Sequence, residues 1–331
     1  MTFPADWRAA SGALCLAFAL CTTTPGAFAA DSEGTWSLVG QTITERTETG
    51  AVALNGKIYV LGSGVPIIGM PNLPLAQEFD PATGRWRDLA PLPQGASHLG
   101  VATLNGKIYV AGGFGVSTHR NPLDQFAEYD PGTDRWRALA PLSSPRGAVG
   151  LAAFGGTIHA IAGHSAENKA VGTHEVFDPA TGKWTSAAPL PLPRNHLGSI
   201  IVADGKLHVF GGRTTGNPAD SVVAHDVYDP ATDKWTAGAP LPDRRSEGGV
   251  ASYRGLILYF GGDCNDPQAP AAFDDLQAFD PKTDSWKSLA KAPIGLHGPG
   301  TAAVGDAVYF IGGNSRCRNS PSNAVYTFRL P

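Results

Sequence analysis

Charge is scarce in this sequence of 331 residues. Only 16% of the residues are Asp, Glu, Lys or Arg, the formal net charge is -4 and the pI is near 6.1. Lys and Arg never gather into a run, so the chain lacks the basic surface with which proteins bind nucleic acids. We therefore expect no nucleic acid among its partners.

The common catalytic motifs are also missing. The sequence has no serine nucleophile motif, no phosphate-binding loop and no zinc spacing of the Cys-x-x-Cys kind. It is instead rich in turn formers, with 41 Gly and 27 Pro, and 42% of its residues are hydrophobic. This composition predicts a turn-rich β protein with a sizeable core.

A hydrophobic run long enough to span a membrane is absent. The apolar stretch from Ala9 to Leu20 is shorter than the roughly 20 residues that a spanning helix needs. It follows Arg8 and precedes Ala27-Phe28-Ala29, which is the pattern of a secretory signal peptide. We predict a signal peptide over residues 1–29, a mature chain without a membrane span, and a periplasmic or secreted location.

Cysteine is rare, with four residues in the whole chain. Cleavage of the signal peptide would remove Cys15 and Cys21. Cys264 and Cys317 would then remain as a pair in an oxidising compartment. We predict that they form a disulfide bond.

Tryptophan recurs with a nearly fixed period. The steps between successive positions are 50, 50, 48, 51 and 51 residues in the series Trp36, Trp86, Trp136, Trp184, Trp235 and Trp286. An apolar run that ends on a glycine recurs once in each period, as from Lys107 to Gly112. Such periodicity predicts six copies of one structural unit.

Each repeat has the pattern of four short strands. An inner strand such as Gly100 to Leu104 reaches Asn105-Gly106, the strongest two-residue signal for a hairpin. The second strand is apolar on both sides, the third ends in an Asp-Pro turn as at Asp130, and the fourth carries the Trp. One such unit cannot bury both of its faces, so the units are expected to stack around a ring.

The two ends of the chain predict how this ring closes. A lone Trp-bearing strand, Thr35 to Leu38, comes first, and a lone third strand, Ala324 to Leu330, comes last. We expect the N-terminal strand to complete the final blade, because this removes the exposed sheet edge of an open ring.

Three features together resemble kelch repeats: a Gly-Gly pair, an aromatic-Asp-Pro turn, and a Trp about 23 residues after the pair. The resemblance covers residues 30–331. It implies an all-β fold, a single six-bladed kelch β-propeller domain with four antiparallel strands per blade. This fold hosts enzymes, receptors and adaptors alike. In relatives of this kind, ligands usually bind at the channel mouth on the face formed by the loops that enter the inner strands.

An arginine column lies four residues before the glycine that begins each inner strand. Its members are Arg46, Ala96, Arg146, Arg194, Arg245 and Leu296. We predict that Arg146, Arg194 and Arg245 bind an anionic ligand, because the guanidinium fork matches a carboxylate. The alternative, which the resemblance implies, is that an Arg at this position ties adjacent blades together through hydrogen bonds.

A second column follows two residues later and is rich in Glu and His. It consists of Glu48, His98, Ala148, His196, Glu247 and Gly298, with His297 directly before the last member. Imidazoles and carboxylates at one mouth can act as general acids and bases or as metal ligands. We predict ligand binding by Glu48, His98, His196, Glu247 and His297. The alternative is a solvated rim in which they satisfy nearby backbone amides.

The loops after the glycine pairs are expected to contribute to the same face. They begin with residues that include His164, Arg213 and Asp263, and the second loop is long and contains His119 and Arg120. His159 and His208 lie within apolar strands, so we predict that they are core residues.

A binding module is the first functional hypothesis. It is an exported propeller that holds a small polar or anionic ligand, sugar-like or a peptide, at the channel mouth. This function needs no metal and no cofactor, and the sequence assigns neither. Whether the protein is also an enzyme is left open by the sequence.

A sugar isomerase is the alternative, because exported six-bladed kelch proteins include sialic-acid epimerases or mutarotases, which this chain resembles in size and predicted location. The resemblance implies a Glu directly after a glycine-terminated strand and an Arg a few residues later. Asp263 is the nearest counterpart of that Glu, and no Arg follows within its loop.

A metal enzyme is the third hypothesis. A copper-radical oxidase is disfavoured, because it needs a Cys joined to a Tyr and both mature cysteines are predicted to pair with each other. Another mononuclear metal could use the Glu and His column, since imidazole and carboxylate suit Zn or Fe. The blades that carry these residues are widely separated in sequence, however, which is expected to hold the side chains apart.

Overall fold

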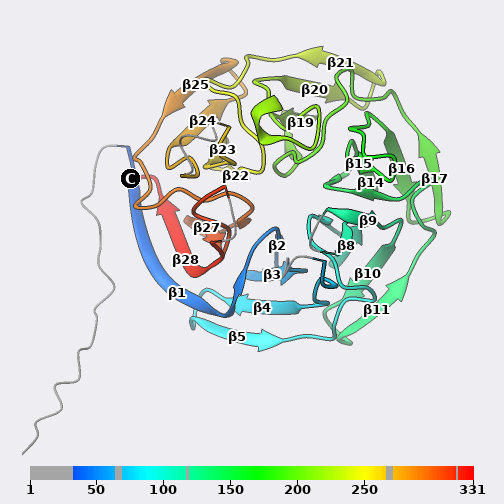
Figure 1. Cartoon of the computed structure of the whole chain (residues 1–331), viewed down its shortest axis with the longest axis horizontal. Coiled ribbons are helices and arrows are strands. Elements are labelled where there is room, and N and C mark those ends of the chain that lie inside the picture. Colours follow the sequence, from blue (N-terminus) through cyan, green and yellow to red (C-terminus); the bar gives the residue numbers. More distant parts are fainter. Residues whose placement is uncertain (1–32, 64–68, 117–118, 266–270, 318–319) are drawn as a thin grey trace, which may run out of the picture.

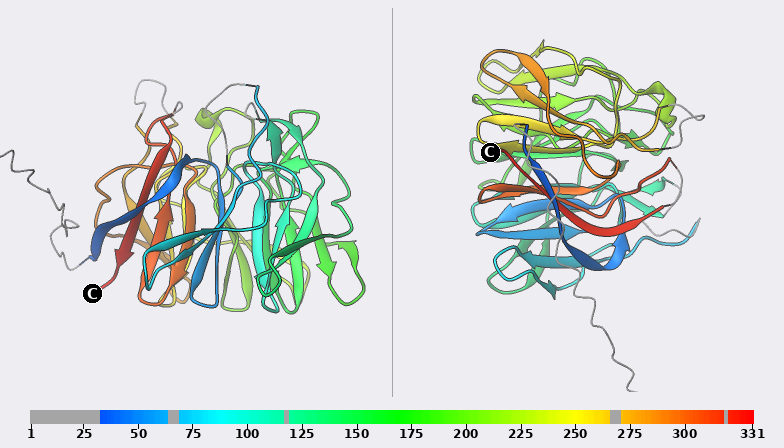
Figure 2. Two further views of the ribbon diagram at one scale, coloured as in Figure 1. Left: turned by 90° about the horizontal axis from the view of Figure 1, so that it is seen from below. Right: turned by 90° about the vertical axis from the view of Figure 1, so that its left-hand side faces the viewer.

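The computed structural model describes residues 33–63, 69–116, 119–265, 271–317 and 320–331. Six four-stranded antiparallel sheets stand around a central channel (Figure 1). The strands run along the ring axis, with short turns at one end and longer loops at the other (Figure 2). The predicted all-β, six-bladed propeller is therefore confirmed, and the signal peptide predicted over residues 1–29 lies outside the described residues.

The first three blades follow one another along the chain, each starting from the strand beside the channel. Blade 1 contains β2 (Gly50–Leu54), β3 (Lys57–Leu61), β4 (Ala76–Asp80) and β5 (Arg85–Asp88). Blade 2 contains β6 (Gly100–Leu104), β7 (Lys107–Ala111), β10 (Phe126–Asp130) and β11 (Arg135–Ala138). Blade 3 contains β13 (Gly150–Phe154), β14 (Thr157–Ile161), β16 (His174–Asp178) and β17 (Lys183–Ser186).

The next two blades repeat this order, and the sixth is built from both ends of the chain. Blade 4 contains β18 (Ile201–Ala203), β19 (Lys206–Phe210), β20 (His225–Asp229) and β21 (Lys234–Ala237). Blade 5 contains β22 (Gly249–Tyr253), β23 (Leu256–Phe260), β24 (Leu276–Asp280) and β25 (Ser285–Ser288). Blade 6 contains β26 (Gly300–Val304), β27 (Ala307–Ile311), β28 (Ser322–Arg329) and β1 (Thr35–Arg46).

Short elements outside the blades belong to the loop face. They are the strand pairs β8 (Phe114–Val116) with β9 (Arg120–Pro122) and β12 (Arg146–Gly147) with β15 (His164–Ser165), and the 3₁₀ helix η1 (Pro218–Asp220). In the described part of the chain, no helix has the length and hydrophobicity needed to cross a membrane.

The turns within the blades form as their sequences predict. Asn105 and Gly106 both have positive φ, at 52° and 73°, as a tight hairpin turn between twisted strands requires. In the Asp-Pro turn of blade 1, the carboxylate of Asp80 accepts a hydrogen bond of 2.9 Å from the amide of Ala82. The equivalent bond recurs at Asp130, Asp178, Asp229 and Asp280. Local sequence therefore suffices to define each blade.

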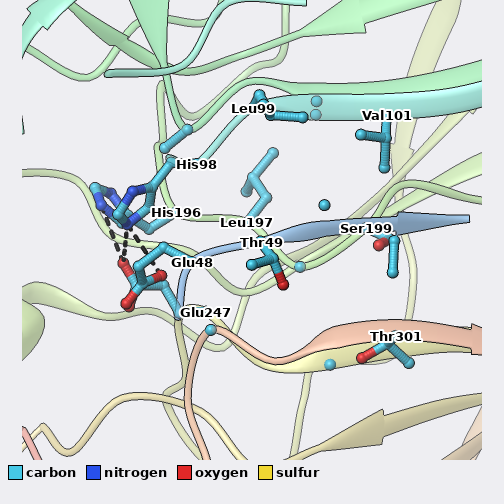
Figure 3. A pocket seen from close by; sticks show the side chains of 18 of the residues that line it. Glu48, Thr49, His98, Leu99, Val101, His196, Leu197, Ser199, Glu247 and Thr301 are labelled. Atoms are coloured by element: carbon cyan, nitrogen blue, oxygen red, sulfur yellow. Dashed lines mark ion pairs between the residues drawn. The ribbon is translucent and has the colours of Figure 1, made fainter. Parts of the chain in front are cut away.

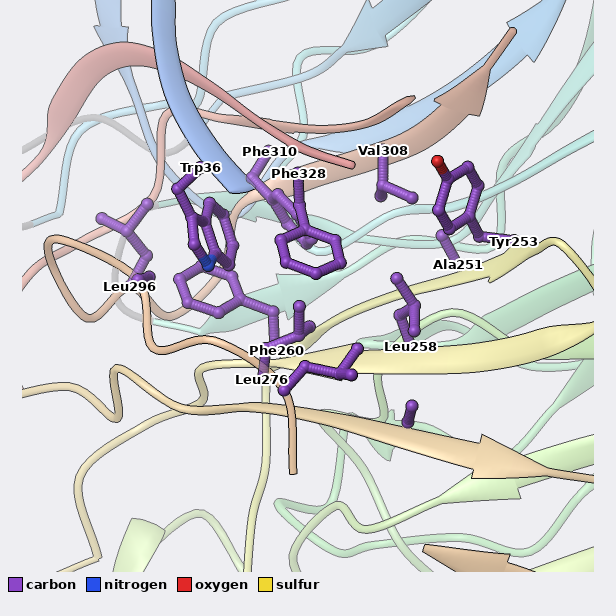
Figure 4. Close-up of a cluster of buried hydrophobic side chains, with 13 residues drawn as sticks. Trp36, Ala251, Tyr253, Leu258, Phe260, Leu276, Leu296, Val308, Phe310 and Phe328 are labelled. Carbon is purple, nitrogen blue, oxygen red and sulfur yellow. The ribbon is translucent and has the colours of Figure 1, made fainter. Parts of the chain in front are cut away.

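The ring closes through the N-terminal strand, as predicted. Strand β1 pairs antiparallel with β28, with Trp36 opposite Phe328, and the blue and red strands lie side by side in Figure 1. The side chain of Trp36 is 2% exposed and packs against Phe260, Phe310 and Phe328 (Figure 4). Phe260 belongs to blade 5, so the closing strand also joins two blades.

Tryptophan side chains join neighbouring blades around the outer edge. The indole Nε1 of Trp36 donates a hydrogen bond of 2.7 Å to the carbonyl of Ala290, in the segment that follows blade 5. Corresponding bonds of 2.8–3.0 Å run from Trp136, Trp184, Trp235 and Trp286 to Ala90, Ala140, Ala188 and Ala239. A buried indole needs such a partner, so the period of the Trp residues follows from one contact repeated around the ring.

Two pairs of histidines are buried in blades 3 and 4. His208 Nδ1 lies 3.0 Å from His225 Nε2, and His225 Nδ1 lies 3.1 Å from the carbonyl of Ala239. His159 and His174 repeat this arrangement at 2.9 Å in blade 3. His159 and His208 are 4% and 5% exposed, which confirms that they are core residues. A carbonyl can only accept, so Nδ1 of His225 carries the proton and its Nε2 accepts from the neighbouring ring.

These pairs predict that the fold loses stability in mild acid. Burial lowers the pKa of His225 from 6.5 to about 4. Between these values the unfolded chain binds a proton that the folded chain does not, so stability is full above pH 6.5 and falls as the pH approaches 4. One such imidazole corresponds to a loss of roughly 3 kcal/mol. Urea unfolding at a series of pH values measures this loss.

The control is the double variant His208→Leu with His225→Leu, which copies Leu258 and Leu276 at the corresponding positions of blade 5. Its stability should fall less than that of the wild type between pH 6.5 and 4. Equal losses in the two proteins would show that the buried imidazoles do not cause the acid sensitivity.

Trp36 should contribute more to stability than the equivalent residue of an internal blade. Replacing it with Ala empties a buried site at the ring closure, which typically costs about 3–5 kcal/mol. Trp136→Ala is the matched control, because Trp136 makes the same hydrogen bond but is only half-buried. Urea unfolding should show the larger loss for Trp36→Ala. An equal or smaller loss would contradict the closing role of β1.

Candidate functional site

One residue in each blade crosses the channel mouth in the left-handed backbone conformation. The six residues have φ between 50° and 61° and are Glu48, His98, Ala148, His196, Glu247 and Gly298; we call them the mouth ring. Five backbone hydrogen bonds of 2.8–3.0 Å join successive members, each from the amide of one residue to the carbonyl of its neighbour in the preceding blade. The second column of the sequence is thus hydrogen-bonded around the mouth, except between Ala148 and His196.

The residue types in the mouth ring are unusual for this conformation. A left-handed residue other than glycine costs roughly 1–2 kcal/mol, and Gly, Asn and Asp adopt it most readily. Four of the six positions carry Glu or His instead. Local strain of this kind is concentrated at functional sites. In Figure 3 the four side chains, Glu48, His98, His196 and Glu247, point toward one another at the end of the channel.

The residues that precede the ring members pair through their backbones with the loops that follow the glycine pairs, and so hold these loops at the mouth. Asn195 exchanges two backbone hydrogen bonds, of 3.0 and 2.9 Å, with Arg213, which directly follows the glycine pair of blade 4. The same pairing joins Ser97 to Phe114, Gly147 to His164, and His297 to Asn314, and Ser246 accepts one bond from Asp263. The predicted loop residues His164, Arg213 and Asp263 reach the mouth for this reason.

Glu247 lies at the centre of the site. Its Oε1 is 3.0 Å from Nε2 of His196, 3.3 Å from Nε2 of His98 and 3.2 Å from a terminal nitrogen of Arg213. Its Oε2 is 3.1 Å from Nδ1 of His297. One buried carboxylate therefore contacts side chains from three other blades.

Glu48 completes the carboxylate pair. Its Oε2 lies 3.1 Å from Nε2 of His98, and its Oε1 lies 3.5 Å from Nδ1 of His297. A side chain at Gly298 would collide with Glu48, because a Cβ there would lie 2.4 Å from Oε2. The expectation that the blades hold these side chains apart was wrong, since the ring brings Glu48, His98 and Glu247 within 4.8 Å of one another.

The charges of the site are mutually balanced. Burial acts to lower the pKa of His98, but the carboxylates of Glu48 and Glu247 raise it to about 9. Burial acts in the same direction on His297, and its bonds to the two carboxylates raise its pKa well above the ordinary value. Burial would raise the pKa of Glu247, yet the guanidinium of Arg213 and the hydrogen bond from His297 keep it well below its usual range.

Arg213 and Asp263 form a second charged group beside Glu247. A terminal nitrogen of Arg213 lies 3.0 Å from Oδ2 of Asp263. Burial, together with the charge of Glu247, raises the pKa of Asp263 to about 6. Asp263 can therefore gain and lose a proton near neutral pH.

His119 was not among the assigned site residues, although it belongs to the site. Its ring centroid lies 4.6 Å from that of His98 and 5.1 Å from that of His196. Ligand nitrogens of these three histidines lie within 4.8 Å of one another. His119 is exposed and comes from the loop between β7 and β10 of blade 2. It lies outside the two aligned columns, so alignment of the inner strands did not select it.

A further column of orienting residues also escaped the sequence interpretation. Ser97 Oγ lies 3.0 Å from Nδ1 of His98, and Asn195 Oδ1 is bonded to Nδ1 of His196. Thr47 Oγ1 donates a bond of 3.3 Å to Glu48. Each of these residues directly precedes the ring member that it contacts. Reading the aligned repeats one position earlier would have shown this series of hydroxyl and amide side chains.

The arginine column lies between the blades. Arg146 is fully buried and donates to the carbonyls of Ala162 and Thr173, at 2.9 and 3.0 Å, as well as to Glu175. Arg194 pairs with Asp226 at 2.7 Å, while Arg245 pairs with Asp275 and donates to the carbonyl of Gly261 at 3.0 Å. Each side chain bonds to its own blade, while the backbone carbonyl of each arginine accepts a bond from a glycine of the preceding blade. These bonds support the alternative that the arginines tie adjacent blades together. Ligand binding by Arg146, Arg194 and Arg245 stays a prediction.

A cavity of about 240 Å³ opens at the mouth, over the charged side chains. Its lining includes Thr47, Glu48, Ser97, His98, His119, Arg213, Glu247, Asp263, His297 and Asn314. On the other side of the mouth ring, the channel is lined by Leu99, Val101 and Leu197 together with Thr49, Ser199 and Thr301 (Figure 3). Charged groups are thus concentrated at one end of the channel.

The predicted disulfide between Cys264 and Cys317 is present. The two residues lie in loops of blades 5 and 6, with their Cα atoms 5.5 Å apart, and Cys317 also lines the cavity. The bond connects positions separated by 53 residues, so it holds two loops of the mouth together.

Curated relatives share parts of this repeat pattern. The chain is 32% identical over 114 residues to Kelch-like protein 35 of Mus musculus, covering 34% of this chain and 19% of that protein. It is 31% identical over 139 residues to Kelch-like protein terF of Aspergillus terreus, covering 41% and 29%. The chain thus spans less than a third of the length of these relatives.

Structural and family comparisons agree with the fold. The solved structure of YjhT superposes with a TM-score of 0.72 at 16% identity, covering 88% of this chain and 99% of that one, which shows a shared fold. The Kelch motif matches residues 95–143. The KLHDC2/KLHL20/DRC7 Kelch-repeats domain matches residues 148–331, more than half of the sequence. The chain therefore belongs to the kelch-repeat family.

Proposed function

We propose that this protein is an exported binding module that holds a small polar ligand, anionic or sugar-like, at the channel mouth. The observation that carries the proposal is the mouth ring, in which four strained backbone positions direct Glu48, His98, His196 and Glu247 toward one point. All six ring members share this conformation and carry the backbone bonds between blades, and at four of them it also directs a Glu or His side chain to the mouth.

The cavity over the ring suits a ligand with both donors and acceptors. Arg213 and His119 present N–H groups, whereas Glu48 and Asp263 present carboxylate oxygens, and all four line the cavity. Its volume of about 240 Å³ is below the usual range for drug-sized ligands. A monosaccharide, an amino acid or the side chain of a peptide is of the appropriate size.

A sugar isomerase is supported by one specific contact. The resemblance implied an acidic residue after a glycine-terminated strand, together with an Arg that is missing from the loop of Asp263. Arg213 from the neighbouring blade lies 3.0 Å from Asp263. It therefore brings to the acidic residue the guanidinium that its own loop lacks. With a pKa of about 6, Asp263 is suited to transfer protons near neutral pH.

Binding should depend on the central carboxylate. Saturation-transfer NMR with sialic acid, glucose, galactose and a glutamate-rich peptide should detect at least one ligand of the wild-type protein. Glu247→Gln keeps the shape of the side chain and removes its charge. Loss of a charged hydrogen bond of about 1.5–3 kcal/mol should weaken binding roughly 10- to 100-fold.

Glu78→Gln is the matched control, because Glu78 is a partly buried carboxylate that pairs with Arg87 on the outer side of blade 1. It should bind as the wild type does. Absence of binding by every compound, or equal affinity of Glu247→Gln and wild type, would contradict the proposal. The same spectra follow exchange between sugar anomers, and acceleration that is lost in Asp263→Asn would favour the isomerase.

Export is tested by expression of the complete gene in a Gram-negative host. The protein recovered from the periplasm or medium should begin near Ala30 when its N-terminus is sequenced, because the signal peptide is cleaved after Ala27-Phe28-Ala29. Protein that stays in the cytoplasm and begins at the start of the chain would contradict export.

A further inference from the structure

Two buried imidazole nitrogens face the same carboxylate oxygen without the geometry of a hydrogen bond. Nε2 of His98 and Nε2 of His196 lie 3.3 and 3.0 Å from Oε1 of Glu247. The two side chains are 5% and 0% exposed. Among the described residues, neither Nε2 atom meets the geometry of a hydrogen bond, although Nε2 of His98 also forms an ion pair of 3.1 Å with Glu48. Buried polar atoms of this kind need an explanation.

The tautomer of His196 determines what its Nε2 atom presents to Glu247. Its Nδ1 is bonded to Oδ1 of Asn195, an oxygen that can only accept, so the ring proton lies on Nδ1. The Nε2 atom then presents its lone pair to the carboxylate of Glu247. A lone pair and an anionic oxygen repel each other at 3.0 Å unless a cation lies between them. Nδ1 of His98 lies 3.0 Å from Ser97 Oγ, a hydroxyl that is able to accept its proton in the same way but can also donate.

This is the arrangement of histidine ligands in metal sites. A ligating His commonly donates its other ring nitrogen to an oxygen, which sets the tautomer and the ring orientation. Around a tetrahedral Zn²⁺ with bonds of 2.0–2.1 Å, neighbouring ligand atoms are separated by about 3.3 Å. The separations of 3.3 and 3.0 Å from Glu247 to the two histidines match that value.

His119 supplies a further ligand from the rim. Its ligand nitrogen lies within 4.8 Å of those of His98 and His196. The side chain is exposed and lines the cavity, so a modest rotation can bring it to an ion held by the other residues. Arg213 and His297 contact Glu247 from other directions and would hold its carboxylate in place.

We propose that the mouth ring binds one divalent transition-metal ion through Nε2 of His98, Nε2 of His196 and a carboxylate oxygen of Glu247, with His119 as the fourth ligand. Imidazole and carboxylate together suit zinc, iron and similar first-row ions. The site opens to the cavity of about 240 Å³, so a small anion could reach the ion. This inference does not depend on the proposed binding of a sugar or peptide.

Metal titration of the full chain tests the proposal directly. The protein is purified under non-reducing conditions, so that Cys264 and Cys317 stay paired, and is stripped with EDTA. Calorimetry with Zn²⁺ alone, and with Co²⁺ alone, should show one saturable site per chain. Bound Co²⁺ should also give the visible absorption of an ion held by nitrogen and oxygen ligands. Absence of saturable binding of both ions to the wild type would overturn the proposal.

Variants identify the ligands. The double variant His98→Gln with His196→Gln should lose affinity by about 100-fold or more, and His119→Gln by roughly 10- to 100-fold. Asn195→Leu should weaken binding about 10-fold or more, because it releases the tautomer of His196 without removing a ligand. His208→Leu with His225→Leu, which removes two imidazoles from the core of blade 4, should bind as the wild type does.

Circular dichroism in EDTA determines whether each variant is folded. His119 is exposed, so His119→Gln provides a test even if the double ring variant fails to fold. Wild-type affinity in folded His119→Gln and Asn195→Leu would place the ion elsewhere and overturn the assignment. No sugar or peptide is present in the titration, so its outcome is independent of the ligand-binding experiment.

Discussion

The hydrogen-bonded ring of left-handed residues at the channel mouth is the constraint on which the rest of the site depends. Each of five ring amides is bonded to a carbonyl of the neighbouring blade, so five of the six junctions around the mouth are held by backbone bonds. The conformation aims one side chain per blade at the axis, and the preceding residue anchors the adjacent loop. Glu48 and Glu247 thus lie within reach of His98 and His297 although they come from different blades.

The outer edge of the propeller provides the rigidity that this mouth requires. Indole nitrogens of five tryptophans bond to carbonyls near the neighbouring blade, and β1 closes the circle by pairing with β28. A closed ring has no free sheet edge. Its diameter is consequently determined by the number of blades, and this diameter decides whether side chains from opposite sides can meet.

Electrostatics explains why the mouth contains both carboxylates and imidazoles. A buried carboxylate without a partner is costly, and Glu247 is surrounded by His98, His196, His297 and Arg213. Protons on His98 and His297 can balance the two Glu side chains, and a divalent cation can do so as well. Asn195 directs the Nε2 lone pair of His196 toward the carboxylate of Glu247. Protonation of the other histidines does not remove the repulsion between that lone pair and the carboxylate.

Much of the fold and part of the site followed from the sequence alone. The Asn-Gly and Asp-Pro turns depend on local chemistry, and the Trp period depends on simple repetition. The closing strand followed from the lone strands at the two ends of the chain, and the Cys264–Cys317 bond from the number of cysteines left after the predicted signal cleavage. The columns also placed Glu48, His98, His196 and Glu247 on one face. Only the tertiary structure showed that these side chains touch, that Arg213 reaches Asp263 of the neighbouring blade, and that His119 joins them from the loop between β7 and β10. The physical reason is that distances across the channel depend on the closure of all six blades, which no local pattern encodes.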